Sequence, residues 1–292
     1  MQRITHDERA AASLLAALAV VLAAVTAFPI LYSLWISFFA VNLRRPNRTP
    51  FVGLDNYATV LTNPQFWDAV ARTAWFSTLS VAAITLVALL VAILLDQDFP
   101  GRRILSACLL IPWAIPSVVN GLMWKWILDS TYGALNGALL QLHLIDHAVI
   151  WLGDATKTIP LIANAFVWKE VPLAAILLLV NLKAIPSDLY AAARVDGAPA
   201  WQRFIHVTLP ALRPGFLLVA LYEAMMAIRH FDLFFLLTEG GPGGASDVLA
   251  WRIYVETFRN LSFGTGAAMS YILALATLLM SYGLIRALAH RL

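Results

Sequence analysis

Four ionisable side chains lie in stretches of the sequence that are otherwise apolar: Lys169, Glu170, Glu223 and His230. A charge inside a membrane-spanning helix costs about 2.5 to 3.5 kcal/mol on insertion scales, so residues of this kind are candidates for function by default. Lys169 and Glu170 are adjacent and stand just before Pro172. One interpretation is a neutralising structural pair. The other is the lining of a polar cavity, with Pro172 breaking the helix where it borders that cavity.

A second group of candidates follows one helical face. Its members recur at spacing i, i+3, i+4, i+7, which places them on the same side of an α-helix. They are Glu223, Met226, Ala227 and His230. Arg229 and Asp232, at i and i+3, are expected to form an ion pair near the outer end of the same helix.

Other residue types that could do chemistry give weak patterns. His143 and His147 stand at i, i+4 with Asp146 between them, but no third zinc ligand is near. The glycine-rich run 240–244 lacks the Lys and Ser/Thr of a phosphate-binding loop, and no Walker motif occurs. We therefore expect no catalytic residue, no metal and no cofactor in this chain, and no ATP hydrolysis by it alone.

Composition identifies the class of protein. Of 292 residues, 61% are hydrophobic and 13% charged, and the mean hydropathy is +0.76, whereas soluble domains are about 25% charged. The chain is predicted to be an all-α integral membrane protein. The net charge of +3 comes from basic residues spread over short segments between apolar blocks, which excludes a nucleic-acid patch. Cys108 is the single cysteine, so no intrachain disulfide can form.

The apolar blocks are long enough for about six membrane-spanning helices. The first is read as an uncleaved helix bent near Pro29, because its apolar run is too long for a signal peptide and has no convincing cleavage site. Pro112 and Pro116 are expected to kink the third. The predicted spans are residues 13–41, 71–95, 104–128, 159–180, 211–237 and 265–289.

The polar segments give an orientation. Three polar segments are predicted outside: residues 42–67, residues 130–158 and the loop that contains 240–244. The second of them is expected to hold an amphipathic piece at 139–145. The turn 96–103 is predicted inside. With the N-terminus inside, ten Lys and Arg lie on the inner side and seven on the outer side. This weak bias favours cytoplasmic termini and a cytoplasmic segment 182–214.

Segment 182–214 is the longest polar interval patterned as helix. We expect one helix over 188–195, ended by Gly197, and a second over 201–207, opened after Pro199 and stopped near Pro210. Three consecutive alanines at 191–193 would let another protein approach closely, so this elbow is a candidate docking surface. An ordinary interhelical loop is the alternative.

The elbow resembles the EAA loop of ABC importer permeases, which runs Glu-Ala-Ala, three residues, Gly, and further on Leu-Pro. The matching residues are Ala191, Ala192, Ala193, Asp196, Gly197, Ala198, Phe204, Thr208, Leu209 and Pro210. The chain is most similar to the carbohydrate, maltose-type (MalF-like) permeases. The similarity continues in FVGLDNY at 51–57, in LPALRP and in TEGGPGG at 238–244, and so covers most of the chain beyond the first helix. One departure is that Ala191 stands where the family usually has glutamate.

The resemblance implies a MetI-like permease fold and two sets of site residues. The solute-contact positions of maltose-type permeases fall on Lys169, Glu170, Leu173, Glu223, Met226, Ala227 and His230. The positions that couple to an ATPase fall on Ala191, Ala192, Ala193, Asp196, Gly197, Ala198 and Phe204. The family's contacts at the first set are largely neutral, so a different specificity is expected here. Without a glutamate at position 191, docking would rest on shape and other contacts.

The resemblance also implies partners and mechanism. These are a second permease, two cytoplasmic ATPases that bind the ATP and Mg²⁺, an extracytoplasmic solute-binding protein, and the lipid of a bacterial or archaeal inner membrane. The expected function is inward transport of a sugar or related polar solute by alternating access. An ion-gradient-driven secondary transporter, with Glu170, Glu223 or His230 as proton-coupling groups, is the alternative; it would usually show an internal repeat, and none is visible. A membrane-embedded enzyme would need a catalytic cluster that the sequence lacks.

Overall fold

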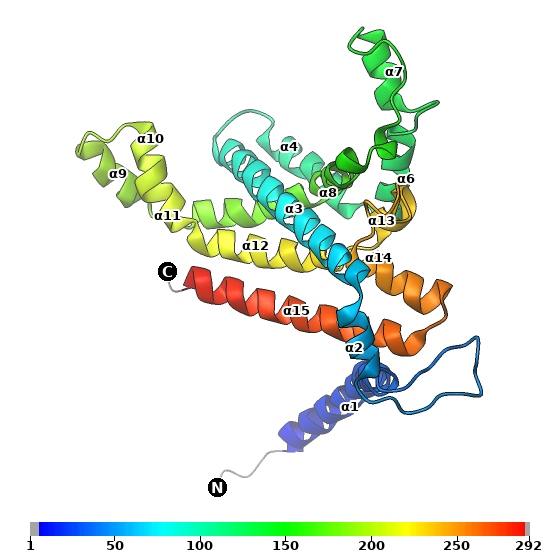
Figure 1. Cartoon of the computed structure of the whole chain (residues 1–292). Coiled ribbons are helices and arrows are strands. Elements are labelled where there is room, and N and C mark those ends of the chain that lie inside the picture. Colours follow the sequence, from blue (N-terminus) through cyan, green and yellow to red (C-terminus); the bar gives the residue numbers. More distant parts are fainter. Residues whose placement is uncertain (1–5, 290–292) are drawn as a thin grey trace. The chain divides into compact units, whose positions relative to one another are not determined.

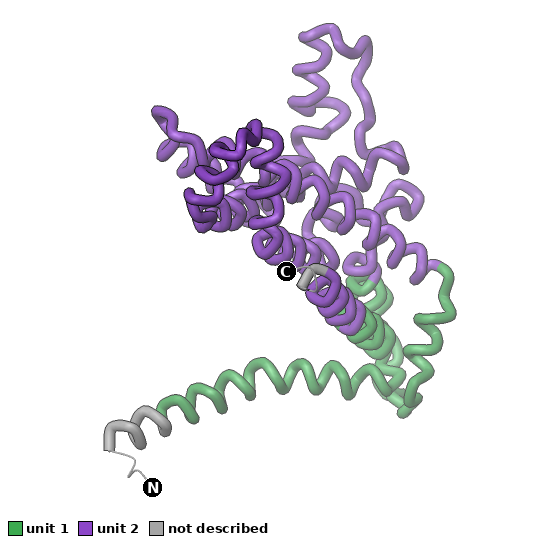
Figure 2. Tube along the Cα trace, turned by 90° about the vertical axis from the view of Figure 1, so that its left-hand side faces the viewer, with its two compact units in different colours: residues 1–64, 253–274 green, residues 65–252, 275–292 purple. Residues whose placement is uncertain are grey.

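The computed structural model describes residues 6–289. The described part is helical apart from turns and two isolated bridges, Phe39 with Phe51 and Asn42 with Ser262, so the predicted all-α fold is confirmed. It forms two compact units, Met1–Pro64 with Ile253–Ala274 and Gln65–Arg252 with Leu275–Leu292 (Figure 2). The single functional domain remains a prediction. The predicted inner-side residues Arg3 and Arg291, like both termini, lie outside the described residues.

Four helices are long and apolar enough to cross a membrane, and two bent helix pairs raise the number to six if each pair is one span. The four lie in α1 (His6–Ile36), α3 (Pro64–Asp96), α8 (Ala155–Lys183) and α15 (Phe263–Ala289) (Figure 1). The bent pairs are Arg102–Ala114 with Ser117–Ile127, at 93°, and Ala200–Ala211 with Arg213–Ile228, at 59°. This agrees with about six predicted spans.

The first unit joins α1, α2 (Asp55–Thr62) and the start of α15. Buried Asn56, within the FVGLDNY run, donates to the carbonyl oxygens of Ser37 at 2.8 Å and Phe39 at 3.0 Å. Gly264 donates its N–H to Val41 at 3.1 Å, so α15 approaches the end of α1 through a residue without a side chain. The first helix runs through Pro29 and ends at Ile36, before the predicted Val41.

Replacing Gly264 with alanine is expected to destabilise the protein. The new Cβ would lie 2.1 Å from the carbonyl oxygen of Phe39, far inside contact distance. Overpacking of this kind costs about 1 to 3 kcal/mol, so the melting temperature in detergent should fall. Gly283→Ala on the same helix is the control, because its Cβ meets nothing within 4 Å. Equal melting temperatures for the two variants would show that the close approach is not structurally important.

The second unit packs around an aromatic cluster. Phe76 of α3 lies 5.5 Å from Phe166 of α8 and 4.9 Å from Phe234 of α13 (Asp232–Leu237), measured between ring centroids. All three rings are almost fully buried. α13 also packs against α6 (Ser117–Ile127), and α8 against α12 (Arg213–Ile228). These contacts fix α8 at the centre of the unit.

The predicted third span is a broken helix. α4 (Arg102–Leu109) and α5 (Ile111–Ala114) run in one direction, and α6 turns away after Pro116. Pro112 and Pro116 lack the N–H that a continuous helix requires. The expected kinks are therefore present. At Pro116 the bend between the two helices reaches 93°, so the helix is broken there and not merely kinked.

The predicted fifth span, 211–237, is wrong as a single helix. α12 ends at Ile228 and α13 begins at Asp232. The expected ion pair between Arg229 and Asp232 does not form among the described residues, because the helix breaks between them; Arg229 Nη2 contacts Met226 Sδ at 3.1 Å instead. The following loop also contains an unpredicted helix, α14 (Leu249–Tyr254), which continues as a π-helical turn at Val255–Arg259.

α8 is continuous from Ala155 to Lys183, so the helix break at Pro172 that one of the two interpretations included is wrong. Asp154 caps its first turn through Thr156, whose backbone N lies 2.8 Å and hydroxyl 2.7 Å from the carboxylate. These hydrogen bonds lower the pKa of Asp154 to about 2. The capping charge therefore contributes fully above about pH 4 and is lost as the pH falls towards 2. Before this cap, α7 (Ala134–Gln141) lies earlier than the amphipathic piece predicted at 139–145.

Candidate functional site

The packing of α8 on α12 brings three intramembrane charges together. Lys169 Nζ lies 3.1 Å from Glu170 Oε1, and both side chains are buried. Glu223, fully buried on α12, interacts electrostatically with both of them. With His230 neutral, one positive and two negative side chains leave the group one charge negative if all three ionise. We call Lys169, Glu170, Glu223 and His230 the charged cluster.

Glu223 has no compensating contact among the described residues. Neither of its carboxylate oxygens has a hydrogen-bond partner there. Glu170 repels it and Lys169, already paired, attracts it more weakly. Burying a carboxylate in this way is costly unless something else satisfies it. Glu223 is thus an acceptor group that the surrounding chain does not use.

His230 reaches the cluster by a different route from the one predicted. It lies beyond the last residue of α12, so the i, i+7 spacing from Glu223 does not place it on that helical face. Its ring instead packs against Phe166, with centroids 4.8 Å apart, and against Phe76 at 6.4 Å. Its Nε2 is buried without a hydrogen-bond partner among the described residues. His230 is therefore a second side chain of the cluster with a buried polar atom that lacks a hydrogen-bond partner among the described residues.

The other predicted solute contacts lie on the same two helices as these groups. Leu173 lies one turn after Lys169 on α8 and is half-buried, as is Met226 on α12, while Ala227 is buried. Pro172, in the same turn of α8, has no N–H, so the carbonyl of Trp168 lacks its usual helical donor. The arrangement offers several acceptors and one ammonium group to a polar molecule.

Sequence reasoning did not single out Asn120. This residue of α6 is buried, and its Nδ2 donates to the carbonyl oxygen of Ala165 at 3.2 Å, while Oδ1 has no partner among the described residues. An amide inside an otherwise apolar predicted span was the available signal. Asn120 is a further candidate for contact with a polar molecule.

The elbow after α8 has the predicted start and turn. α9 (Ser187–Val195) ends with Gly197 at φ +76°. Gly197 N donates to the carbonyl of Arg194 at 3.1 Å and Ala198 N to that of Ala193 at 2.9 Å. This is the hydrogen-bond pair of a Schellman motif, which requires a left-handed residue and so favours glycine.

The second half of the elbow ends at Ala211, next to Pro210 as predicted, but its helical run extends beyond the predicted residue 207. α10 (Ala200–Arg203) continues as a π-helical turn, Phe204–Thr208, into α11 (Leu209–Ala211). Leu209 N donates to the carbonyl of Phe204, five residues back. The wider turn lets the helix accommodate Pro210, which has no N–H to donate.

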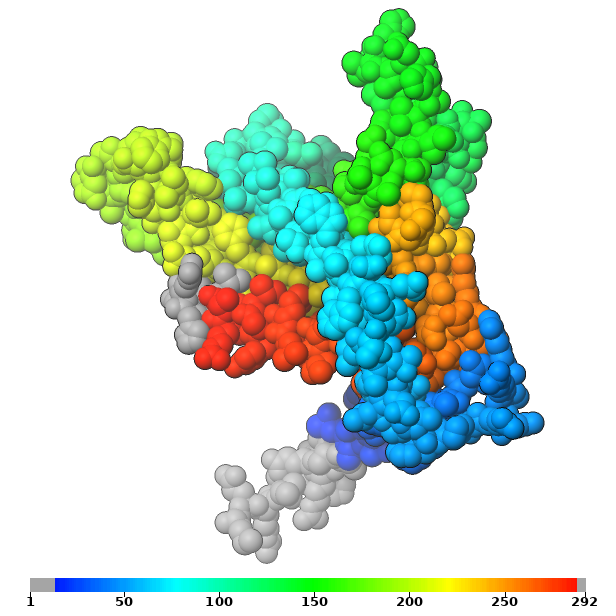
Figure 3. Space-filling view, viewed as in Figure 1, coloured from blue at the N-terminus to red at the C-terminus, as the bar shows by residue number. Residues whose placement is uncertain are grey.

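The elbow presents a surface that the described chain leaves uncovered. Ala191, Ala192 and Asp196 are exposed, and Ala193, Ala198 and Phe204 are half-buried. Four larger apolar side chains join them with exposed fractions of 45% to 88%: Leu189, Val195, Trp201 and Ile205. In the space-filling view, this part of the chain forms a projecting lobe of the second unit (Figure 3). Exposed apolar groups gathered in this way are typical of a protein interface.

Tyr190→Phe is expected to loosen the elbow. The Tyr190 hydroxyl lies 2.9 Å from Thr208 Oγ1 and ties α9 to the π-helical turn. A hydrogen bond of this kind contributes about 1 kcal/mol, so amide hydrogen exchange in residues 187–211 should become about fivefold faster. Tyr282→Phe is the control, because that tyrosine is 62% exposed on α15. Unchanged exchange in the elbow would mean that this hydrogen bond does not hold its two halves together.

Comparisons with known proteins extend these observations. Residues 84–292 match the family model described as "Binding-protein-dependent transport system inner membrane component". The matched residues include α8, the elbow and α12. They therefore contain the charged cluster and the exposed elbow surface.

Characterised relatives align over most of both chains. The trehalose/maltose transport system permease protein MalF of Thermococcus litoralis is 38% identical over 248 residues, 84% of this chain and 81% of the relative. The trehalose transport system permease protein SugA of Mycobacterium tuberculosis is 33% identical over 91% of this chain and 84% of the relative. The sulfoquinovosyl glycerol transport system permease protein SmoG of Agrobacterium fabrum is 30% identical over 91% of this chain and 86% of the relative.

A solved structure shares the fold. It is a chain of a bacterial ABC transporter involved in the import of the acidic polysaccharide alginate. The TM-score is 0.82 at 21% identity, over 97% of each chain.

Proposed function

This chain belongs to the family of binding-protein-dependent transport system inner membrane components, and from this premise we propose that it moves a sugar or related polar solute through the membrane as part of an ABC importer. The observation that supports this most is the meeting of buried, incompletely satisfied charges on α8 and α12, with the elbow exposed between those two helices in sequence. One helix pair thus bears both a polar site and a docking surface.

The charged cluster fits a solute with many hydroxyl groups. The two carboxylates accept hydrogen bonds from hydroxyls, and the Lys169 ammonium donates them. The relatives named for trehalose and maltose transport take their names from neutral sugars with many hydroxyl groups. Glu170 and Glu223 disfavour an anionic solute, so we propose a neutral oligosaccharide or a glycoside with a cationic group.

The elbow is the surface on which we propose that the ATPase subunits act. Two ATPase subunits would dock on the elbows of this chain and of a second permease, using the exposed alanines and the apolar side chains around them. Because Ala191 replaces the usual glutamate, shape and apolar contact would dominate this interface. Both chain ends and the elbow would face the cytoplasm, and an extracytoplasmic binding protein would deliver the solute to the opposite face.

Transport would proceed by alternating access. ATP binding brings the ATPases together, and the elbows move with them. The movement turns α8 against α12, opening the charged cluster towards the loaded binding protein. ATP hydrolysis resets the helices and exposes the solute to the cytoplasm.

Reconstitution of the complete complex in proteoliposomes tests this proposal. Uptake of radiolabelled trehalose or maltose should require ATP inside the vesicles and the binding protein outside. It should also survive a protonophore. Uptake that continues without ATP and collapses with the protonophore would instead support the ion-gradient-driven mechanism and overturn the proposal.

A further inference from the structure

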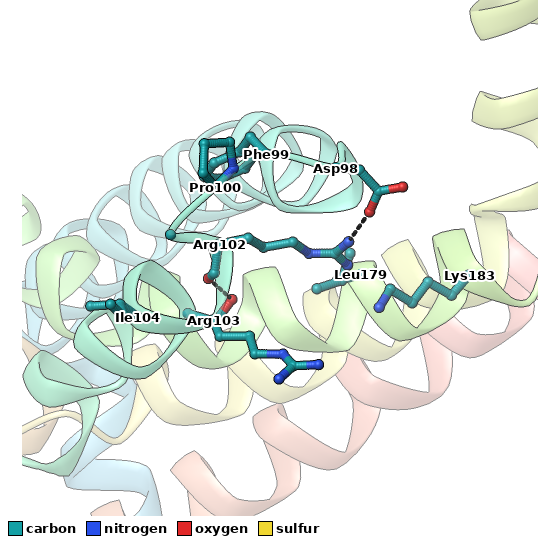
Figure 4. A pocket seen from close by; sticks show the side chains of 10 residues that line it. Asp98, Phe99, Pro100, Arg102, Arg103, Ile104, Leu179 and Lys183 are labelled. Atoms are coloured by element: carbon teal, nitrogen blue, oxygen red, sulfur yellow. Dashed lines mark hydrogen bonds and ion pairs between the residues drawn. The ribbon is translucent and has the colours of Figure 1, made fainter.

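A basic cavity lies where the turn after α3 meets the end of α8 (Figure 4). Its volume is about 1100 Å³. Arg102 and Arg103 enter it from the start of α4, and Lys183 from the last turn of α8. The close-up shows these three side chains extending into the same space. Residues about 80 positions apart in the sequence therefore form one cationic site.

The positive charge of this cavity is not balanced within the described chain. Asp98, the one acidic residue lining it, pairs with Arg102 at 3.0 Å. Three cations and one anion leave a net charge of two positive. Arg103 and Lys183 make no ion pair among the described residues. Two arginines at the start of a helix are also disfavoured by its dipole, so an anion in the cavity would relieve both costs.

The cavity lies at a membrane boundary. α3 ends at Asp96 and α8 at Lys183, and both are candidate membrane spans. Ile104 and Leu105, next to the arginines on α4, are 71% and 41% exposed. Apolar side chains exposed beside basic ones are typical of contact with lipid.

A second cavity lies further along α8, beside the part of that helix that is long and apolar enough to cross the membrane. Its volume is about 500 Å³, and it is lined by α3, α4, α5 and α8. Its wall is largely apolar and includes Val87, Leu109 and Val171. Leu179 in the basic cavity and Pro172 in the apolar one are seven residues apart on α8, or about 10 Å along the helix. The same helices thus form a cationic mouth and an apolar groove behind it.

We propose that this pair of cavities binds one anionic phospholipid, with its phosphate between Arg103 and Lys183 and an acyl chain in the groove along α4 and α8. The cationic mouth supplies the charge for the phosphate, and the groove supplies the apolar contact that a free phosphate ion would not need. The site is separate from the charged cluster and does not depend on the solute proposed above. It adjoins the elbow, because Lys183 is the last residue of α8 before α9.

Native mass spectrometry of the complete complex in detergent tests the headgroup. Phosphatidylglycerol is titrated against phosphatidylcholine with the wild type and with Arg103→Gln/Lys183→Gln, which leaves the Arg102–Asp98 pair intact. The affinity for phosphatidylglycerol should fall roughly 30-fold, which corresponds to about 1 kcal/mol for each of the two basic contacts. Arg45→Gln/Arg48→Gln is the control, because it removes two basic residues outside the cavity. This variant should change the affinity for phosphatidylglycerol less than twofold. Equal affinity in wild type and the first variant would overturn the proposal.

Cys108 gives a readout for the acyl chain. It is the single cysteine of the chain, it is exposed, and it lines the apolar groove. Phosphatidylglycerol should slow its alkylation by N-ethylmaleimide at least threefold, whereas inorganic phosphate should not. Protection by inorganic phosphate alone would identify a simple anion site. Lipid binding by the isolated chain but not by the complex would mean that a partner subunit covers the cavity. Either outcome would contradict the lipid assignment.

Discussion

Replacement of Glu223 by alanine is expected to lower solute uptake by about tenfold to a hundredfold while the complex still assembles. A hydrogen bond to a charged group is worth about 1.5 to 3 kcal/mol, and this carboxylate has no hydrogen-bond partner among the described residues. Its acceptor capacity is therefore free for the solute. The measurement is ATP-dependent uptake in proteoliposomes, together with the yield of assembled complex.

A stability measurement separates this role from a structural one. Glu223→Gln keeps the volume but removes a charge that Glu170 repels, so its melting temperature should equal or exceed that of the wild type. Glu256→Ala, a change outside the cluster, should affect neither quantity strongly. Full uptake by Glu223→Ala would remove this residue from the solute site. A parallel loss of uptake and stability would point to a structural role.

Replacement of Gly197 by tryptophan is expected to reduce uptake to near background while ATP hydrolysis by the complex continues. Gly197 has φ +76°, and a Cβ at this position meets no atom within 4 Å. A large side chain would therefore project from the elbow into the space where an ATPase subunit is proposed to dock. A left-handed backbone also costs a non-glycine residue about 1 to 2 kcal/mol.

Two milder variants distinguish obstruction from backbone strain. Asparagine tolerates the left-handed conformation, so Gly197→Asn should keep most of the uptake. Gly197→Ala adds strain with little bulk and should give an intermediate value. The measured quantity is the number of solute molecules transported per ATP hydrolysed. Normal coupling in Gly197→Trp would count against docking at this surface.

Much of the helical framework could be predicted because its signals are local. Apolar runs of sufficient length identify the spans. Pro112 and Pro116 indicate that the third span is broken. Gly197 after a helix-forming run predicts the Schellman turn. In contrast, nothing local marks the break between α12 and α13, since residues 226–234 contain neither Gly nor Pro. That break follows from the packing of α13 against α6.

The candidate site was only partly predictable for the same reason. The cost of intramembrane charge singles out Lys169, Glu170 and Glu223 residue by residue. Their convergence depends on how α8 crosses α12, which no spacing within either helix encodes. His230 was assigned to the cluster through a helical repeat that the structure interrupts, although Phe166 brings it there. Contact of these residues with a solute remains a prediction.

The unbroken course of α8 has a mechanical consequence. At about 1.5 Å per residue, its 29 residues span roughly 43 Å. Lys169 is the fifteenth of them, midway between the Asp154 cap and the elbow. A stiff rod that pivots about its capped end moves its midpoint half as far as its tip. If the elbow moves as proposed above and α8 pivots about its capped end, α8 would transmit a swing of the elbow to the charged pair as a smaller displacement.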